Sequence, residues 1–391
     1  MTNLRKFPLV PLAYIAALML WGGWLFNVTL GQGAIDRAGQ VIGTDFVMFY
    51  AAGHSLAEGA QARLYDFAYQ YHLQQSLIGA KFSGTYNFYV SPFAAILYAP
   101  FAGFSYLTAF VLWTLLGLVL LWNALRFLGF PFPVAHMLLS LTFFPVFAAA
   151  TYGQNSLLSL FVLSGVYLLW KRGAGLEAGL LSAVLAYKPQ LLLGVIVLWL
   201  VLKARRELLG LMCGLVFAGA VCALVMPDAV LSYLLLAKTR FAELTTEASF
   251  PVKKQVSVYG FFYLLLGRKV FAAKVLALLT GAAAVIMFVR ANGGRQVSEA
   301  YKFSSAVLLT FFLSPHMMIY EMTLLLIPAV LLWREAVCSA EILRSYNLVV
   351  WVAAFISIGA VGVQLESLGF ALQPATLAVI LVSADLWLRR R

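Results

Sequence analysis

Charged side chains are scarce in this sequence. Asp, Glu, Lys and Arg make up 11% of the 391 residues, whereas 63% are hydrophobic and the mean hydropathy is +0.92. A soluble domain carries about 25% charged residues. A chain this apolar cannot bury all its apolar surface in the core of a soluble domain. The bilayer must therefore act as its solvent. The composition therefore predicts a single all-α integral membrane domain over residues 1–391, with no sizeable soluble domain.

Several signatures of known chemistry are also missing. The chain has no Walker A sequence and no Gly-x-Gly-x-x-Gly fingerprint, so we expect no nucleotide in a familiar fold. No group of His, Cys and carboxylate residues has metal-ligand spacing, and we expect no metal and no cofactor. The three cysteines show no spacing typical of a disulfide framework.

Basic residues exceed acidic residues by 27 to 15. They form short clusters between apolar runs rather than a stripe, so nucleic acid is not an expected partner, whereas anionic membrane lipids are. The clusters fall at alternate turns, and the positive-inside rule places all of them in the cytoplasm. Both termini then lie inside, and twelve spans fit. The clusters are Arg5/Lys6, Lys171/Arg172, Lys203/Arg205/Arg206, Arg290/Arg295/Lys302, Arg334/Arg344 and Arg389–Arg391.

Apolar runs predict the spans. The first, residues 8–30, is longer than the 7–15-residue core of a signal peptide and is followed by no clear cleavage site, so we interpret it as an uncleaved helix. Several later runs are shorter than the ~20 residues that a spanning helix needs, which suggests local thinning or helices that stop at a polar cavity. Residues 90–104 contain Pro92 and Pro100 and are expected to be re-entrant or interfacial. The other runs lie near residues 106–126, 133–150, 156–170, 175–187, 190–202, 207–226, 269–289, 303–315, 318–333, 347–363 and 370–388.

The polar segments gather on the opposite, extracytoplasmic side of the expected cell membrane, which we take to be that of a bacterium. They are the loops 31–90 and 227–257 and the turns at 152–155, 187–190 and 314–316. Within 31–90 the spacing of Phe46, Phe49 and Tyr50 predicts a helix in the membrane interface with its aromatic side chains toward the lipid. A second helix is predicted over residues 64–78.

Asp45 stands at the start of the first of these helices, and two interpretations are open. Aspartate is a common N-cap, which is a structural role. Alternatively, a carboxylate at the membrane surface can serve as a general base, because desolvation raises its pKa toward the working pH.

Lys188 lies between two short apolar runs, next to Pro189. It could extend its ammonium to the headgroups, as lysines near helix ends do, but it breaks the positive-inside pattern that the other clusters follow. An ionisable residue at membrane depth is a functional candidate. A lysine suits a phosphate as a compact point charge.

Three further polar residues are candidate substrate-binding groups. His316 follows Ser314-Pro315 at an expected helix break, and it could either pack at the interface or bind a substrate hydroxyl or phosphate. Gln154 and Asn155 could cap the next helix or hydrogen-bond a sugar. Lys253 and Lys254 are expected to be solvated loop charges, with contact to a lipid phosphate as the alternative.

Together these pieces resemble glycosyltransferase family 87. The resemblance rests on motifs that follow one another over roughly residues 40–320. The family usually has Tyr-Pro-Pro where this chain has Val90-Ser91-Pro92. The motifs are Asp45-Phe46-x-x-Phe49-Tyr50, Leu64-Tyr65-Asp66, Tyr89-Val90-Ser91-Pro92-Phe93, Ala99-Pro100-Phe101, Gly153-Gln154-Asn155, Tyr187-Lys188-Pro189 and Ser314-Pro315-His316.

The resemblance implies a GT-C-like fold, a polyprenyl-phosphate-linked sugar donor and a catalytic carboxylate at Asp45. The acceptor would be a lipid or a glycan. A transporter or lipid flippase is the alternative, and it predicts repeated halves and charges near the bilayer midplane, neither of which is clear here. A non-catalytic scaffold would give no reason for Asp45 and Lys188 to lie on the same outer face.

Overall fold

The computed structural model of the protein describes residues 9–79, 82, 86–130, 133–239, 251–293, 297–357 and 371–389. Within these ranges the ordered structure is helical, and extended backbone pairs only in three isolated bridges. The expected all-α class is therefore confirmed. Five basic residues of the expected clusters, Arg5, Lys6, Arg295, Arg390 and Arg391, lie outside the described ranges.

Among the described residues, four helices are long and apolar enough to cross a membrane. A fifth crossing results if α6 (Pro133–Leu141) and α7 (Phe144–Thr151) count as one span broken by an 81° bend. Only 6–28% of the residues in the four long windows are buried, which leaves most of their apolar surface for lipid. The protein is thus a polytopic helical membrane protein. The four helices are α1 (Leu9–Thr29), α5 (Tyr106–Phe127), α11 (Arg205–Val225) and α14 (Val270–Asn292).

The remaining apolar runs also form helices, but these have only 8 to 17 residues. At 1.5 Å per residue they fall short of the ~30 Å hydrocarbon core. Several end at a polar turn, as the short runs suggested, and the count of twelve spans stays a prediction. They are α8 (Ser156–Lys171), α9 (Gly175–Ser182), α10 (Leu193–Leu202), α15 (Glu299–Leu313), α16 (Leu326–Arg334), α17 (Ala340–Ile356) and α18 (Pro374–Leu388).

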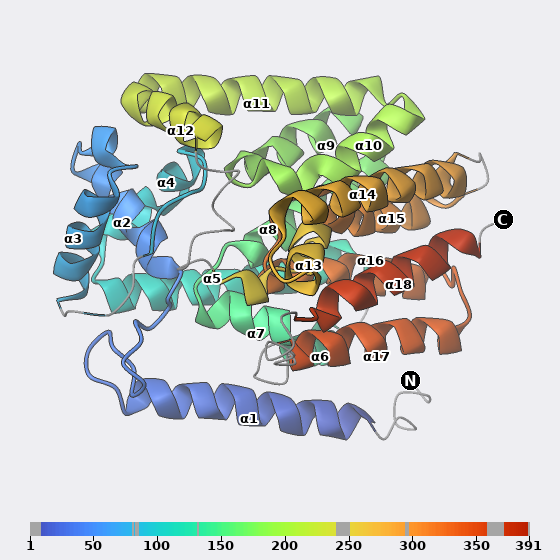
Figure 1. Cartoon of the computed structure of the whole chain (residues 1–391), viewed down its shortest axis with the longest axis horizontal. Helices are drawn as coiled ribbons and strands as arrows, with labels where there is room; N and C mark the ends of the chain where they lie inside the picture. Colours follow the sequence, from blue (N-terminus) through green and yellow to red (C-terminus); the bar gives the residue numbers. More distant parts are fainter. Residues whose placement is uncertain are drawn as a thin grey trace.

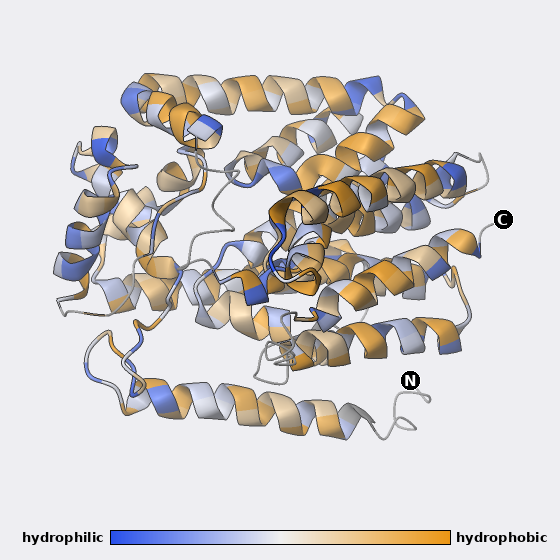
Figure 2. Ribbon diagram, viewed as in Figure 1, coloured by the Kyte–Doolittle hydropathy of each residue, from blue (hydrophilic) through white to orange (hydrophobic). Residues whose placement is uncertain are grey.

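The long helices run along one direction of the molecule (Figure 1). α2 (Phe46–Ala57), α3 (Phe67–Ile78) and α12 (Pro227–Thr239) gather at one end of that axis, whereas α1 begins and α18 ends at the other. Figure 2 shows hydrophobic residues along most of the length of α11 and α14. The described ends of the chain therefore lie at the same end of the bundle, and the cytoplasmic position of both termini stays a prediction.

The two helices predicted in residues 31–90 are present as α2 and α3. α3 begins at Phe67 rather than at residue 64, because the Asp66 carboxylate caps it by accepting a hydrogen bond from the Tyr69 backbone N–H at 3.0 Å.

The orientation predicted for α2 is wrong. Its aromatic side chains are buried inside the protein rather than turned toward lipid: Phe49 stacks on Tyr98 at 4.7 Å, and Phe46 meets Phe110 edge-on at 5.7 Å. Gly53 permits this packing, because a Cβ atom there would lie 2.6 Å from the Tyr98 carbonyl oxygen. α2 is consequently a core helix, and it fixes the residue at its N-terminus firmly.

Two other loop predictions need comment. Residues 90–104 form no spanning helix but a short α4 (Phe93–Tyr98) and a 3₁₀ turn, η3 (Ala99–Gly103), which pack on α2. The prediction of a loop over residues 227–257 is partly wrong, because residues 227–239 form helix α12. Leu231, Leu234 and Leu235 form an exposed apolar stripe on α12, as expected of a helix at a membrane interface.

Candidate active site

Asp45 is held in place through both its backbone and its side chain. Its backbone N–H donates to the Tyr152 carbonyl at 3.0 Å, and its Oδ2 accepts a hydrogen bond from Gln154 Nε2 at 2.7 Å. Although Asp45 occupies the N-cap position of α2, its side chain makes no capping hydrogen bond. The geometry therefore does not support the capping interpretation, and the carboxylate faces residues that are distant in sequence.

Two glycines allow the turn before α2 to meet the turn after α7. Gly43 and Gly153 both have positive φ, 71° and 69°. A Cβ on Gly153 would lie 2.4 Å from the Phe46 Cβ, and a Cβ on Gly43 would lie 2.5 Å from the Phe110 ring. A larger residue at Gly153 would displace Phe46 at the start of α2, and one at Gly43 would displace the Phe110 ring of α5, so only glycine fits at either position.

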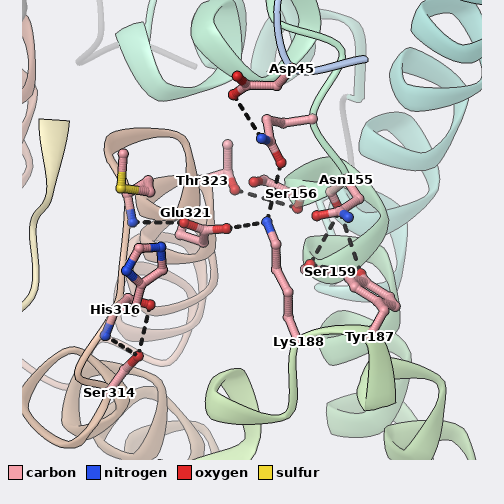
Figure 3. Close-up of polar contacts among 12 residues, drawn as sticks. Asp45, Asn155, Ser156, Ser159, Tyr187, Lys188, Ser314, His316, Glu321 and Thr323 are labelled. Carbon is pink, nitrogen blue, oxygen red and sulfur yellow. Dashed lines mark hydrogen bonds and ion pairs between the residues drawn. The ribbon is translucent and has the colours of Figure 1, made fainter. Parts of the chain in front are cut away.

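Gln154 joins Asp45 to Lys188 by one hydrogen bond to each, and Figure 3 shows Asp45, Lys188 and Glu321 along this series of contacts. Its Oε1 accepts from Lys188 Nζ at 3.2 Å while its Nε2 donates to Asp45. Since an ammonium can only donate, the amide oxygen must face Lys188 and the amide nitrogen must face Asp45. The predicted base and the predicted phosphate-binding lysine are thus brought together through a predicted sugar-binding residue.

Lys188 lies in the turn between two 3₁₀ helices, η4 (Ala183–Tyr187) and η5 (Pro189–Leu192). The residue is only 6% exposed, so its ammonium is held inside the protein rather than extended to the headgroups. The Ser91 hydroxyl donates to the Ala186 carbonyl at 2.9 Å and holds this turn in place. Ser91 lies just before α4, so this hydrogen bond joins the Lys188 turn to the segment that packs on α2.

Glu321 completes the chain of contacts, and sequence reasoning missed it. It lies on η8 (Ile319–Leu325), where its Oε1 pairs with Lys188 Nζ at 2.5 Å and its Oε2 accepts from the Met318 N–H at 2.8 Å. It is 3% exposed. A carboxylate inside an apolar run was a signal that could have found it.

His316 stands in the turn that leads into η8. Its carbonyl accepts from the Ser314 hydroxyl at 3.0 Å, and its backbone N–H donates back to that oxygen at 3.4 Å. Gln255 and Ser257 hold the turn by donating to the Pro315 carbonyl at 2.8 and 3.1 Å. Desolvation and, to a lesser extent, the Lys188 charge lower the pKa of His316 to about 4, so its imidazole is neutral at pH 7.

Asn155 does not join this chain of contacts. It is fully buried, and its backbone carbonyl accepts from the Ser159 hydroxyl at 3.2 Å and from the Tyr187 hydroxyl at 3.5 Å. In Figure 3 Asn155 lies beside Ser159 and Tyr187, apart from the contact between Lys188 and Glu321.

Lys254 approaches the site from a different segment. It is the last residue of η7 (Val252–Lys254), and its ammonium lies 4.7 Å from the centre of the Tyr152 ring. Tyr152 is the residue whose carbonyl anchors Asp45. The lysine expected to be a solvated loop charge is therefore exposed, yet it lies next to the turn that anchors Asp45.

The site leaves Asp45 suited to proton transfer. Desolvation raises the pKa of Asp45 above its usual value, while the Gln154 hydrogen bond and the charges of Lys254 and Lys188 act in the opposite direction. Desolvation thus gives the Asp45 carboxylate a higher proton affinity than an exposed aspartate, while Gln154 holds one of its oxygens in place. In the described part of the chain, no three His, Cys, Asp or Glu side chains come together as a metal site.

Comparison with known proteins identifies the family. The model of glycosyltransferase family 87 matches residues 88–315, more than half of the chain. No curated protein and no solved structure gives a match. Gln154 and Lys188 fall inside the matched region, whereas Asp45, His316 and Glu321 lie outside it. The chain belongs to glycosyltransferase family 87.

Proposed function

We propose that the protein transfers a hexose, with mannose as the first candidate, from a polyprenyl-phosphate donor to a lipid or glycan acceptor. The reaction takes place on the extracytoplasmic side of the cell membrane, in a GT-C-like fold. The observation that carries the proposal is the chain of Asp45, Gln154, Lys188 and Glu321, which links a carboxylate base to a buried cation.

Asp45 serves as the base. Its free oxygen takes the proton of an acceptor hydroxyl, and that hydroxyl oxygen attacks the anomeric carbon of the donor sugar. The bond between the anomeric carbon and the phosphate oxygen breaks, and its electron pair leaves with the phosphate. One base and one good leaving group suffice for a single displacement with inversion, so no covalent sugar–enzyme intermediate is needed.

Lys188 supports the leaving phosphate. An ammonium has three N–H donors, and the described partners Gln154 and Glu321 use two of them. The third can point at a phosphate oxygen, where a buried cation stabilises developing negative charge more strongly than it would in water. His316 and Gln154 add neutral hydrogen-bonding groups for the phosphate or the sugar, and Asn155 supports the turn that carries Gln154.

The surroundings of the site support this donor class. The described helices expose apolar side chains, such as Leu224 and Leu231, over which a polyprenyl tail could lie while the headgroup binds Lys188. The sequence lacks a nucleotide-binding motif, which disfavours a soluble nucleotide-sugar.

The test uses the purified protein in lipid vesicles with a membrane lipid extract as acceptor source. Radiolabelled polyprenyl-phosphate mannose and GDP-mannose are offered side by side, with Asp45→Asn as the inactive control. We expect label to move only from the polyprenyl-phosphate sugar. Transfer from the nucleotide-sugar alone would overturn the donor class.

A further inference from the structure

Lys188 is a cation buried close to a carboxylate base, and such a neighbour would weaken the base. An ammonium in contact with Asp45 would hold it as a stable carboxylate with little affinity for a proton. The structure avoids this contact, because Gln154 hydrogen-bonds to both Asp45 and Lys188. The Lys188 ammonium forms its ion pair with Glu321 instead (Figure 3).

We propose that Glu321 is a positioning residue that holds the Lys188 ammonium away from Asp45. The base then meets the neutral amide of Gln154 rather than a bare cation. The proposal rests on the proposed function in taking Asp45 as the base. It assigns a role to a carboxylate that lies outside the region matched by the family model.

Glu321 is itself fixed, as an anchor must be. Its Oε2 accepts the Met318 backbone N–H at 2.8 Å, which leaves Oε1 for Lys188 at 2.5 Å. The side chains of Glu321 and Lys188 are only 4% and 8% exposed. Because water hardly competes at such a pair, the ammonium stays with its carboxylate.

Other charges around Asp45 do not duplicate this function. Lys254 is the second cation that faces the carboxylate, but it is exposed and lies over the Tyr152 ring. The remaining facing groups are tyrosine hydroxyls, which are neutral at pH 7. The titratable groups that face Asp45 are Lys188, Lys254, Tyr86, Tyr106 and Tyr320.

Infrared titration of the protein in vesicles reads the protonation of Asp45 without requiring turnover. The protonated-carboxyl band of Asp45 is identified as the band missing in Asp45→Asn. In Glu321→Gln the Lys188 charge is unopposed and can move toward Asp45. We expect the titration midpoint of Asp45 to fall by about one pH unit. The acid limb of the pH–rate profile should move to lower pH with it.

The double variant Lys188→Met/Glu321→Gln separates positioning from a merely structural role. Once the cation is gone, Glu321 has nothing to hold, so the downward shift should disappear. The double variant also leaves no unpaired buried charge, and should fold even if Glu321→Gln does not. Glu321→Asp keeps the charge but shortens its reach, and should give a smaller shift in the same direction.

Thr323→Val is the matched control. Thr323 is buried on the same 3₁₀ helix, and within the described part of the chain its hydroxyl donates to the Ser156 carbonyl at 3.4 Å. Its replacement should leave the Asp45 midpoint unchanged. An unchanged midpoint in both Glu321→Gln and Glu321→Asp, or an equal shift with and without Lys188, would overturn the positioning role. A shifted midpoint without sugar transfer by the parent protein would instead count against the proposed function alone.

Discussion

Ion pairs of the same chemical kind occur in two different settings in this molecule. Lys188 and Glu321 meet between polar turns, with side chains 8% and 4% exposed. Lys171 and Glu335 pair at 3.0 Å where α8 and α16 end, with side chains 39% and 28% exposed. The buried pair continues through Gln154 to Asp45, whereas the exposed pair only joins two helix ends.

The setting decides what each pair can do. Taking two charges out of water costs several kcal/mol per ion, and a buried pair is often no more stabilising than apolar residues of the same volume. A pair like Lys188–Glu321 is therefore weak evidence for stability and better evidence for chemistry. An exposed pair contributes about 0–1 kcal/mol and carries no such implication.

The largest effect should come from Asp45, where the contacts that begin at the buried Lys188–Glu321 pair end. Asp45→Asn removes the proton acceptor but keeps the shape of the side chain. We expect transfer to fall at least ~100-fold, because general base catalysis contributes about 10²–10⁴-fold. Sugar transfer and thermal unfolding are measured together. Near-normal turnover in a folded Asp45→Asn protein would remove Asp45 from the chemistry.

Replacement of the buried cation should have the next largest effect. Lys188→Ala leaves Glu321 buried without its partner, and we expect both a loss of stability of about 3–5 kcal/mol and weak donor use. Lys188→Arg keeps the charge with a different geometry, and should retain part of the activity. Donor saturation curves and unfolding curves check this prediction. Equal activity of the parent and Lys188→Ala would take Lys188 out of the donor site.

Substitution of two glycines, one in the site and one at the end of α3, compares the two regions. Gly153→Ala should cost about 1–2 kcal/mol for its positive φ and more for the clash with Phe46, and it should lower activity by displacing the N-terminus of α2. Gly79→Ala is the matched control, since its φ is 70° but nothing lies within 4 Å of the added Cβ. Equal losses of stability and activity in the two variants would show that the contact at Gly153 is unimportant.

The sequence predicted the helices better than their surroundings. Apolar runs located most of the described helices, because hydropathy is set by the residues themselves, but they did not locate α12, which lies in an expected loop. The orientation of α2 could not be predicted, since Phe46 and Phe49 suit a lipid surface and a protein core equally well. What decided between them was α4 and η3, which pack against that face.

The site was predicted in part for a similar reason. Asp45 and Lys188 stood out because each is a charge beside an apolar run, but nothing in the sequence tells that Gln154 bridges them. Glu321 was missed because the Ser314-Pro315-His316 motif drew attention to the turn, whereas Glu321 lies five residues beyond His316 in an apolar run. Contacts between residues more than 100 positions apart, such as Lys188 and Glu321, depend on the tertiary fold.

The smallest effect should come from the exposed pair. Lys171→Met and Glu335→Gln each remove one partner of a contact that water and salt already screen, so we expect less than about 1 kcal/mol of stability to be lost. Sugar transfer should be unchanged, since Lys171 and Glu335 lie where α8 and α16 end, whereas the polar segments 152–155 and 314–321 precede these helices. Unfolding curves at low and high salt, with Lys188→Ala measured beside them, give the comparison directly. If Lys171→Met destabilised the protein as much as Lys188→Ala did, burial would not be what distinguishes the two pairs.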